Sequence, residues 1–305
     1  MSGPSPSAPL NVAITGASGL VGTALTARLE SLGHTVRPVV RRDAVDREIP
    51  WNPAEGIIEP RDFVGLDAVV HLAGAGIFDR RWNPEHKRAI RDSRTRGTAL
   101  LAEALASLPS PPPTLLSGSA VGYYGDRAGA ALDETSPAGT GFLADVVVAW
   151  EEAAAMAVEA GIRTCFLRTG IVMSSAGGAL KTQLPLFKAG LGGRLGSGQQ
   201  YLAWIGMTDV VESIVHLLGS EVSGPVNLAG PTPVTNAEFT DILGEVVHRP
   251  TIIPIPRFGP KLLLGGEMAE ELLFVSQRVV PQVLLDDGFT FAHPTVADAL
   301  HAELD

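Results

Sequence analysis

The sequence predicts a mixed α/β fold built on a doubly wound parallel sheet, with a smaller C-terminal lobe. Short β-rich runs alternate with helical runs through the first half of the chain, which is typical of parallel strands joined by crossover helices. A glycine-rich turn joins the first strand-like run to the first helical run. The 305 residues are 45% hydrophobic, enough for one large domain or for a domain with an added lobe.

The expected elements follow in strand–helix order. Apolar runs bounded by turn residues predict buried strands, at 10–16, 34–40, 66–74, 114–120, 162–173 and 224–230. Apolar residues at helical spacing predict helices, at 20–33, 85–108, 143–161 and 208–220. Gly33 is expected to end the first helix, and Thr208 or Asp209 to cap the start of the last.

The second half of the chain is more irregular. Residues 177–200 are rich in glycine, and we expect them to be mostly loop. Thr235 and Glu238 have the spacing of a capping box at the start of a further helix. The proline-rich remainder indicates a small mixed lobe.

Composition excludes several classes of protein. A net charge of −10 argues against nucleic acid or an anionic membrane as the main partner. The single cysteine, Cys165, excludes an internal disulfide and a cysteine-based metal site. The seven histidines lack metal-site spacing, so no metal is predicted. Without a signal-like start or an apolar run of ~18 residues, a cytoplasmic protein is expected.

The motif "TGASGLVG" predicts a dinucleotide site. It places Gly16, Gly19 and Gly22 between a predicted strand and a predicted helix. One glycine allows the tight turn, another lets the backbone approach a pyrophosphate, and the last lets the helix pack closely on the strand. The helix N-terminus then offers unpaired N–H groups to the phosphates. The alternative is a glycine-rich turn without a ligand.

Two arginines follow the second predicted strand. An acidic residue near this point would accept a hydrogen bond from the ribose 2′-hydroxyl of NAD. Here Arg41 and Arg42 come first, in "VVRRD", and a guanidinium would pair with a 2′-phosphate instead. We therefore predict NADP(H) over NAD(H). In the alternative, both arginines are solvated and Asp43 has the acidic role.

These motifs carry a resemblance to a known family. Together with "HLAGAGI" and "LLSGSAVGYYG", the glycine motif resembles the extended short-chain dehydrogenase/reductase superfamily. More narrowly, the chain is similar to its epimerase-like oxidoreductases, through "RRWNPEHKRAIRDSR", "GGRLGSGQQYLAWI", "GPVNLAGPTPVTNAEF" and a C-terminal stretch from "LLFVSQRVV". The resemblance covers nearly the whole chain from residue 10 onward.

The resemblance implies a Rossmann-type domain with a substrate lobe. It implies that NADPH is held by Gly16, Ser18, Gly19, Leu20, Val21, Gly22, Arg41 and Arg42, with Leu72, Ala73 and Gly74 against the cofactor. We accordingly place a disordered lead-in at 1–9, an NADP-binding domain at 10–230 with a substrate-lobe insertion near 174–204, and a small substrate lobe at 231–305.

The resemblance also implies a catalytic serine, tyrosine and lysine. Ser119 fits the serine position, with Ser117 as a rival. The Tyr-x-x-x-Lys pair is missing, because the two registers anchored on the following glutamates give Leu143 with Val147, or Ala144 with Val148.

Tyr123 and Tyr124, just beyond Ser119, are the nearest substitutes for the missing tyrosine. Free tyrosine has a pKa of about 10, so either one would need a tuned environment to exchange protons near neutral pH.

The favoured hypothesis is an NADPH-dependent oxidoreductase that reduces a small carbonyl or unsaturated compound. A catalytically silent NADPH-binding regulatory module is the alternative, because the usual pair is absent. A nucleotide-sugar epimerase is a third and weaker hypothesis. That chemistry fits tightly held NAD, whereas the two arginines predict NADP(H). We expect a small-molecule substrate, and a homodimer is left open.

Overall fold

The central feature of the fold is a mostly parallel sheet. The computed structural model describes residues 8–305, so most of the predicted lead-in lies outside the described residues. Within that range eight strands form the sheet, and only the pairing of the last two in the order is antiparallel. In spatial order these strands are β12 (Gly224–Leu228), β8 (Arg163–Thr169), β6 (Thr114–Ala120), β5 (Ala68–His71), β1 (Asn11–Thr15), β2 (Thr35–Val40), β3 (Ile49–Asn52) and β4 (Ile57–Ile58).

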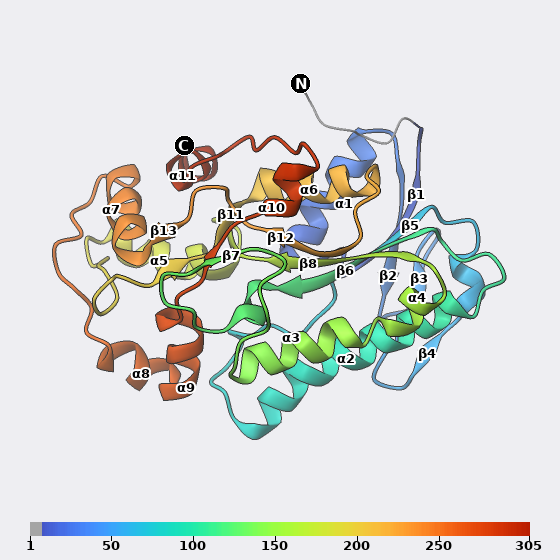
Figure 1. Ribbon diagram of the computed structural model, residues 1–305, viewed down its shortest axis with the longest axis horizontal. Helices are drawn as coiled ribbons and strands as arrows, with labels where there is room; N and C mark the ends of the chain where they lie inside the picture. The colour runs from blue at the N-terminus through green and yellow to red at the C-terminus, as the bar shows by residue number, and fades with distance from the viewer. Residues whose placement is uncertain (1–7) are drawn as a thin grey trace.

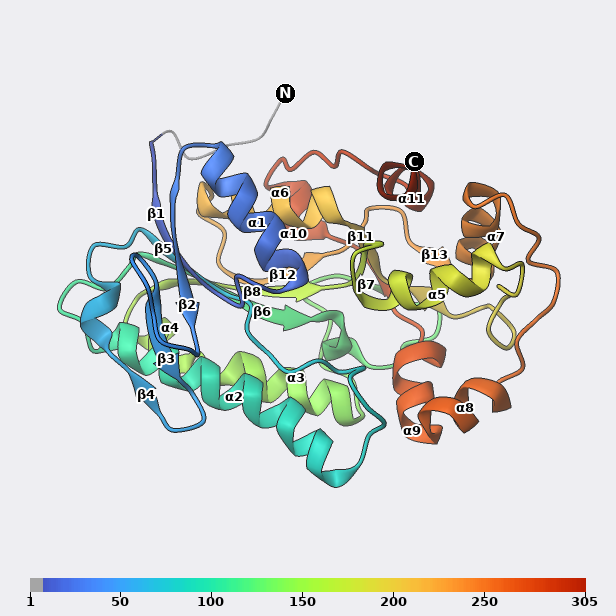
Figure 2. The same ribbon diagram turned by 180° about the vertical axis from the view of Figure 1, so that it is seen from behind.

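Helices cover both faces of this sheet (Figures 1 and 2). One face carries α1 (Leu20–Ser31), α6 (Met207–Leu218) and α10 (Gln282–Asp286). The other carries α2 (Pro84–Ala106), α3 (Phe142–Glu152) and α4 (Ala155–Glu159). Strand residues alternate between the faces, so Val12 and Ile14 pack in the first core while Ala13 packs in the second. The predicted doubly wound sheet is confirmed.

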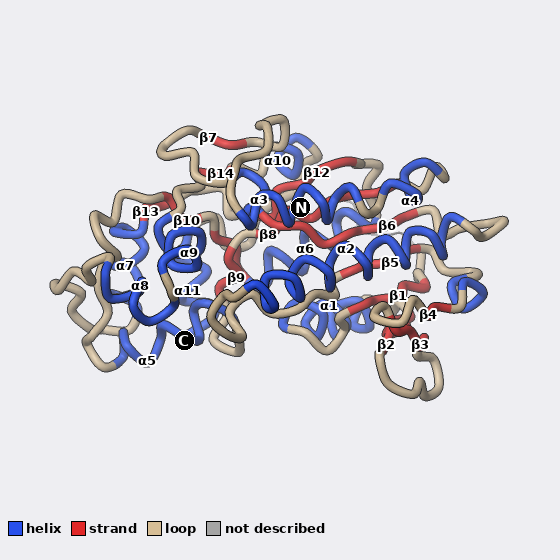
Figure 3. Tube along the Cα trace, turned by 90° about the horizontal axis from the view of Figure 1, so that it is seen from below, coloured by secondary structure: helices blue, strands red, loops and turns tan. Residues whose placement is uncertain are grey.

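The C-terminal lobe lies beyond the carboxyl ends of the strands, and in Figure 1 the arrows of β6 and β8 point toward it. Its helices are α5 (Gly178–Lys188), α7 (Asn236–Val246), α8 (Phe258–Leu264), α9 (Gly266–Ala269), the π-helical turn η3 (Glu270–Phe274) and α11 (Val296–Leu304). They gather at one end of the molecule (Figure 3). A separate apolar core there includes Phe187, Trp204, Phe239 and Leu300.

Short strand pairs and turns connect the sheet with the lobe. These are β9 (Ile171–Met173) with β11 (Trp204–Gly206), β10 (Tyr201–Leu202) with β13 (Val234–Thr235), β7 (Ala131–Leu132) with β14 (Arg278–Val279), and the 3₁₀ turn η2 (Val121–Tyr124) after β6. A second 3₁₀ turn, η1 (Pro60–Phe63), joins β4 to β5 within the sheet domain.

Two predicted elements are each divided in the structure. The strand expected at 162–173 leaves the central sheet at Gly170, where a Cβ atom would lie 2.9 Å from the Ala203 carbonyl oxygen. The helix expected at 143–161 is interrupted between α3 and α4. Ala157 of α4 packs in the core on the face of the sheet that these two helices cover.

Two predictions of local structure are wrong. Residues 178–188, expected as loop, form α5, because Leu180, Leu184 and Phe187 recur at helical spacing and are buried in the lobe core. The start of α6 has Gly206 as its N-cap, without a capping side chain. Asp209 is buried instead, and it accepts hydrogen bonds from the backbone N–H groups of Ala292 and His293.

Two predicted caps are confirmed. Thr235 and Glu238 form both hydrogen bonds of the capping box at α7. Gly33 follows α1 with a φ of +83°, the left-handed conformation in which glycine commonly ends helices.

Candidate functional site

The glycine turn between β1 and α1 is held in a close-packed conformation. Gly16 has a φ of +69°, and the Gly19 N–H donates to its carbonyl oxygen at 2.9 Å. A Cβ atom at Gly22 would lie only 2.1 Å from the Gly16 carbonyl oxygen. A Cβ atom at Gly16 would lie 2.9 Å from the Leu72 carbonyl carbon. The first and third glycines therefore permit contacts that any other residue would prevent.

The first turn of α1 has no side-chain cap. Its N-cap is Gly19, so the first N–H groups of the helix are not satisfied by a side chain there. Ser18 is exposed, while Leu20 and Val21 are half-buried. A Cβ atom at Gly177 would lie 3.1 Å from Leu20 Cδ1, so the segment before α5 lies against this turn.

A buried histidine network fixes the loop after β5. Thr15 Oγ1 accepts hydrogen bonds from the Leu72 and Ala73 N–H groups, at 3.1 and 3.2 Å. The same hydroxyl pairs with His71 Nδ1 at 2.7 Å, and His71 Nε2 pairs with Thr98 on α2 at 3.0 Å. Burial lowers the pKa of His71 to about 4, so the ring is neutral at neutral pH. The loop at 72–74 therefore lies in a fixed position beside the glycine turn.

The end of β2 forms a second part of the candidate site. A cavity of about 260 Å³ opens there, lined by Arg41, Arg42, Asp43, Pro50, Trp51, Asn52, Ile57 and Glu59. Arg42 forms a two-pronged ion pair with Glu48, at 2.5 and 2.7 Å. Arg41 is exposed and makes no hydrogen bond or ion pair with any residue of 8–305. Of the two arginines, Arg41 has the guanidinium available for a ligand.

These features fit a dinucleotide that carries a 2′-phosphate. The glycine turn leaves room for backbone contact with the pyrophosphate, and Arg41 supplies a free cation at the end of the neighbouring strand. We call the carboxyl ends of β2, β1, β5, β6 and β8, with the loops that follow them, the carboxyl edge.

Ser119 belongs to a hydrogen-bonded set on the same edge. Its Oγ donates to Glu151 Oε1 at 2.6 Å. Glu151 in turn accepts from Arg168 Nε and Nη2, at 2.8 and 2.9 Å. Ser119 and Arg168 face each other in the register of β6 and β8. By contrast, Ser117 is fully buried and its hydroxyl has no partner within residues 8–305.

Arg168 is the buried cation of this set. Burial alone would lower its pKa, but the hydrogen bonds and charge of Glu151 outweigh that effect, and the pKa is raised. Arg168 and Glu151 thus form a bidentate, largely buried ion pair, with side chains 4% and 13% exposed. The sequence predicted no site role for Glu151 or Arg168. Only the strand register and the packing of α3 bring these residues together.

The two tyrosines after Ser119 have different environments. Tyr124 is fully buried, donates its hydroxyl to Asn227 at 2.7 Å, and receives a hydrogen bond from Arg168 at 3.1 Å. Burial raises the pKa of Tyr124 to about 12. These observations argue against the direct substrate contact expected of Tyr124. Tyr123 is half-buried, with Arg168 Cζ 3.5 Å from its ring centroid, and its hydroxyl has no hydrogen-bond partner among residues 8–305.

The positions of the missing pair lie on an apolar face of α3. A Cβ atom at Gly122 would lie 3.5 Å from Leu143 Cβ and 3.8 Å from a Val147 methyl carbon. Val147 is buried in this contact. Glu271 of the C-terminal lobe accepts hydrogen bonds from the Phe142 and Leu143 N–H groups, both at 2.8 Å. The lobe therefore holds the end of α3 beside the site.

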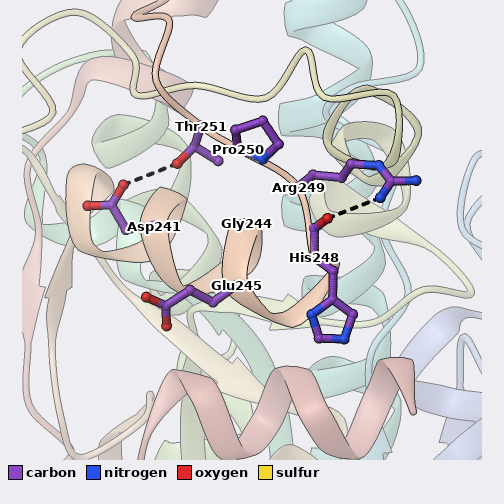
Figure 4. A pocket seen from close by; sticks show the side chains of 7 residues that line it. All are labelled: Asp241, Gly244, Glu245, His248, Arg249, Pro250 and Thr251. Carbon is purple, nitrogen blue, oxygen red and sulfur yellow. Dashed lines mark hydrogen bonds between the residues drawn. The ribbon is translucent and has the colours of Figure 1, made fainter.

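A larger cavity lies elsewhere, at the end of α7. It measures about 590 Å³ and is lined by Asp241, Gly244, Glu245, His248, Arg249, Pro250 and Thr251 (Figure 4). None of the predicted site residues lines it. Across residues 8–305 no group of acidic, histidine or cysteine side chains is arranged to hold a metal ion. No helix in that same range is both long and apolar enough to span a membrane.

Known proteins resemble the chain over almost its full length. It is 46% identical to the epimerase family protein Mb2239 of Mycobacterium bovis, over 95% of this chain and 96% of that protein. A crystal structure of human epimerase family protein SDR39U1 with NADPH matches with a TM-score of 0.88 and 34% identity, covering 96% of this chain and 99% of that one. A nucleoside-diphosphate sugar epimerase from Corynebacterium glutamicum matches with a TM-score of 0.81 and 37% identity, over 98% of this chain and 60% of that one.

The predicted cofactor agrees with the NADPH in the human relative. Residues 255–303 match the model of a domain of unknown function, DUF1731. Residues 12–229 match the NAD dependent epimerase/dehydratase family, which covers more than half of the chain. The chain therefore belongs to the NAD dependent epimerase/dehydratase family, within the extended short-chain dehydrogenase/reductase superfamily that its motifs resemble.

Proposed function

We propose that the protein is an NADPH-dependent oxidoreductase that reduces a small carbonyl or unsaturated compound at the carboxyl edge. The observation that carries the proposal is Ser119, held by Glu151 and Arg168 on the same edge as the glycine turn. Fixed polar groups beside a dinucleotide site are what hydride-transfer chemistry requires of the protein. The NADPH in the human relative supports the choice of cofactor.

In this proposal the nucleotide is bound by the residues predicted from the sequence. The glycine turn and first turn of α1 bind the pyrophosphate through Gly16, Ser18, Gly19, Leu20, Val21 and Gly22. Arg41 binds the 2′-phosphate, because Arg42 is already paired with Glu48. The fixed loop of Leu72, Ala73 and Gly74 lies along the nicotinamide half. When bound, the reduced nicotinamide supplies a hydride.

The roles of Ser119 and Tyr123 follow from their hydrogen bonds. The Ser119 proton is donated to Glu151, so its oxygen is left to accept a hydrogen bond from a substrate hydroxyl or N–H group. The unpartnered Tyr123 hydroxyl can donate a proton to the substrate oxygen as negative charge develops there. Arg168, stacked on the ring, holds Tyr123 in place. Tyr124 has a positioning role through Arg168 and Asn227.

A catalytically silent NADPH-binding module is the second candidate. The apolar contact of Leu143 and Val147 with Gly122 favours it, because the positions of the usual tyrosine and lysine serve packing alone. Such a module would bind NADPH and change its affinity for a protein partner without turnover.

Deuteride transfer distinguishes the two candidates. The protein is first shown to bind NADPH by fluorescence titration. It is then incubated with a small-molecule extract and NADPH deuterated at either face of the nicotinamide C4. Protein-dependent deuterium in a metabolite, detected by mass spectrometry, is the expected result. Absence of label, while a control reductase labels its own substrate, would favour the silent module.

Variants then test the assigned residues on the labelled substrate. Tyr123→Phe is expected to lower turnover about 100-fold, a typical contribution of a positioned proton-transfer group. Ser119→Ala is expected to lower it about tenfold, because one hydrogen bond contributes about 1 to 1.5 kcal/mol. Ser117→Ala is the matched control, because it removes an unpartnered hydroxyl from the same strand. Unchanged turnover in Ser119→Ala and Tyr123→Phe would overturn both roles. A larger loss in Tyr124→Phe than in Tyr123→Phe would transfer the proton-donor role to Tyr124.

A further inference from the structure

The most exposed apolar side chains of the protein are concentrated in one segment of the C-terminal lobe. Within residues 8–305, the five large apolar side chains with the highest exposure all lie between positions 252 and 263: Ile252, Ile253, Phe258, Leu262 and Leu263. The last three belong to α8, a helix that has no buried residue. Leu262 and Leu263 are 78% and 69% exposed. Exposed apolar side chains that gather in this way mark a binding surface.

The last turn of α8 lies against the loop at 72–83, which precedes α2. Arg81 of this loop donates from Nε and Nη2 to the carbonyl oxygens of Leu263 and Leu262, both at 2.6 Å. A cation at this end of a helix pairs with carbonyl groups that have no partner in the helix, and it suits the negative end of the helix dipole. The contact therefore joins the two exposed leucines to the loop.

Half-buried apolar side chains continue from this loop to the candidate site. Trp82 packs edge-on against Phe142 at the start of α3, with ring centroids 5.0 Å apart. The next residue, Leu143, lies against η2, because a Cβ atom at Gly122 would be 3.5 Å from Leu143 Cβ. Gly122 immediately precedes Tyr123, the proposed proton donor. We call the following residues the apolar strip: Leu143, Phe142, Trp82, Leu262 and Leu263.

Two lysines beside the apolar strip are engaged within the protein. Lys87 pairs with Glu267 at 2.6 Å, and its Nζ lies 4.3 Å from the centroid of the Phe142 ring. Lys261 of α8 pairs with Glu270 at 2.5 Å. A diphosphate would have to break such pairs to gain cations of its own, whereas an uncharged chain leaves them intact.

One cation near the strip has no such partner. Arg80, next to Arg81 in the loop, is exposed and makes no hydrogen bond or ion pair with any residue of 8–305. A single exposed cation attracts an anion only weakly in water, so Arg80 does not by itself make a diphosphate site. The charges therefore favour an apolar occupant for the strip.

We propose that the apolar strip binds the hydrocarbon chain of the substrate, with the reacting group at Ser119 and Tyr123. The substrate class is then a carbonyl or unsaturated compound that carries an alkyl chain. Contact with the chain removes apolar surface of Leu262 and Leu263 from water, which favours binding without any new polar contact. The inference rests on the proposed function, because the proposed catalytic residues fix the position of the reacting group.

The position of Trp82 allows a direct test by fluorescence quenching. The other three tryptophans, Trp51, Trp150 and Trp204, are buried, whereas Trp82 is half-buried within the strip. A bromine atom quenches tryptophan emission only at short range, so decanol with a terminal bromine reports contact with Trp82. The full-length protein is saturated with NADP⁺ before the brominated decanol is added.

We expect saturable quenching that is lost in Trp82→Phe and is reversed by unbrominated decanol. Unbrominated butanol should compete about tenfold more weakly than decanol or less effectively still, because each fully buried methylene strengthens binding about fourfold.

A double variant and a matched control test the two leucines. Leu262→Asn with Leu263→Asn should weaken binding of brominated decanol about tenfold, because it removes apolar contact area at two positions. Both side chains are exposed, so the melting temperature should be unchanged. Val64→Asn is the control, because Val64 is 58% exposed and lies before β5 begins, at the opposite edge of the sheet. It should leave binding unchanged.

The proposal is overturned if brominated decanol does not quench Trp82, or if the double variant and the wild type bind it equally. Displacement of brominated decanol by uridine diphosphate would also overturn it, because the strip would then be part of a nucleotide site. So would conversion of a dimer into a monomer by the double variant with quenching retained, which would assign the surface to contact between copies. Absence of deuterium transfer would overturn the reductase proposal alone, because quenching requires no turnover.

Discussion

At the β1–β2 half of the carboxyl edge, the candidate ligand-binding groups come from the short stretch between Gly16 and Arg42. At the β6–β8 half, Ser119 depends on a glutamate from α3 and an arginine from β8. The first half uses backbone geometry and an exposed cation, whereas the second uses a buried ion pair. A backbone turn can be specified locally, but a buried charge requires partners brought from elsewhere in the fold. The two halves should therefore respond differently to substitution.

The largest effect is expected from breaking the buried ion pair. Arg168→Met leaves Glu151 buried beside an apolar side chain, which typically costs about 3 to 5 kcal/mol of unfolding free energy. Arg28→Met is the control, because its ion pair with Glu212 is 41% and 32% exposed and should contribute about 1 kcal/mol or less. Denaturant unfolding measures both. Equal losses in the two variants would contradict the stabilising role assigned to the buried ion pair of the β6–β8 half.

His71, which is hydrogen-bonded to Thr15 of β1 and Thr98 of α2, should make stability depend on pH. Its pKa is about 4 in the folded protein and 6.5 in the unfolded chain, so protons bind preferentially to the unfolded chain between these values. Its contribution is complete above pH 6.5 and falls as pH decreases toward 4, by about 1.4 kcal/mol per pH unit at most.

The check is denaturant unfolding at several pH values with His71→Asn as the comparison. The variant lacks this titration, so its stability should decrease less steeply between pH 6.5 and pH 4. Parallel pH profiles for the wild type and the variant would show that His71 does not titrate in this way.

Replacing a glycine by alanine should lower the free energy of unfolding most where the backbone is close-packed, as in the glycine turn. Gly22→Ala places a methyl carbon 2.1 Å from the Gly16 carbonyl oxygen and should destabilise the fold by about 2 kcal/mol, with weaker NADPH binding. Gly33→Ala is the control, because nothing lies within 4 Å of its Cβ position. It should cost about 1 kcal/mol, from its positive φ alone, and leave NADPH binding unchanged.

The smallest effect concerns cofactor choice. Arg41→Met should weaken NADPH binding about tenfold, or roughly 1.4 kcal/mol, and leave NADH binding unchanged. Arg42→Met should weaken it less, because Arg42 is already paired with Glu48. Fluorescence titration with both nucleotides tests this. A larger effect at Arg42 would mean that its ion pair with Glu48 opens when the ligand binds.

The sequence by itself determined the parallel sheet and the candidate nucleotide-binding half of the site. The signals for both are local: the alternation of strand and helix patterns, the three glycines and the two adjacent arginines. Each depends on residues that are close in the sequence, which set either the backbone conformation or the local charge. Such signals do not show that Arg42 is paired with Glu48 and that Arg41 is free.

Only the tertiary structure decided the other half. It placed Arg168 opposite Ser119 through strand register, turned Glu151 toward both, buried Tyr124 and left the Tyr123 hydroxyl unpartnered. These contacts join residues that are distant in the chain, and their energetic effects depend on the removal of charged and polar groups from water. Neither the long-range contact nor the burial of a charge is encoded in local sequence spacing.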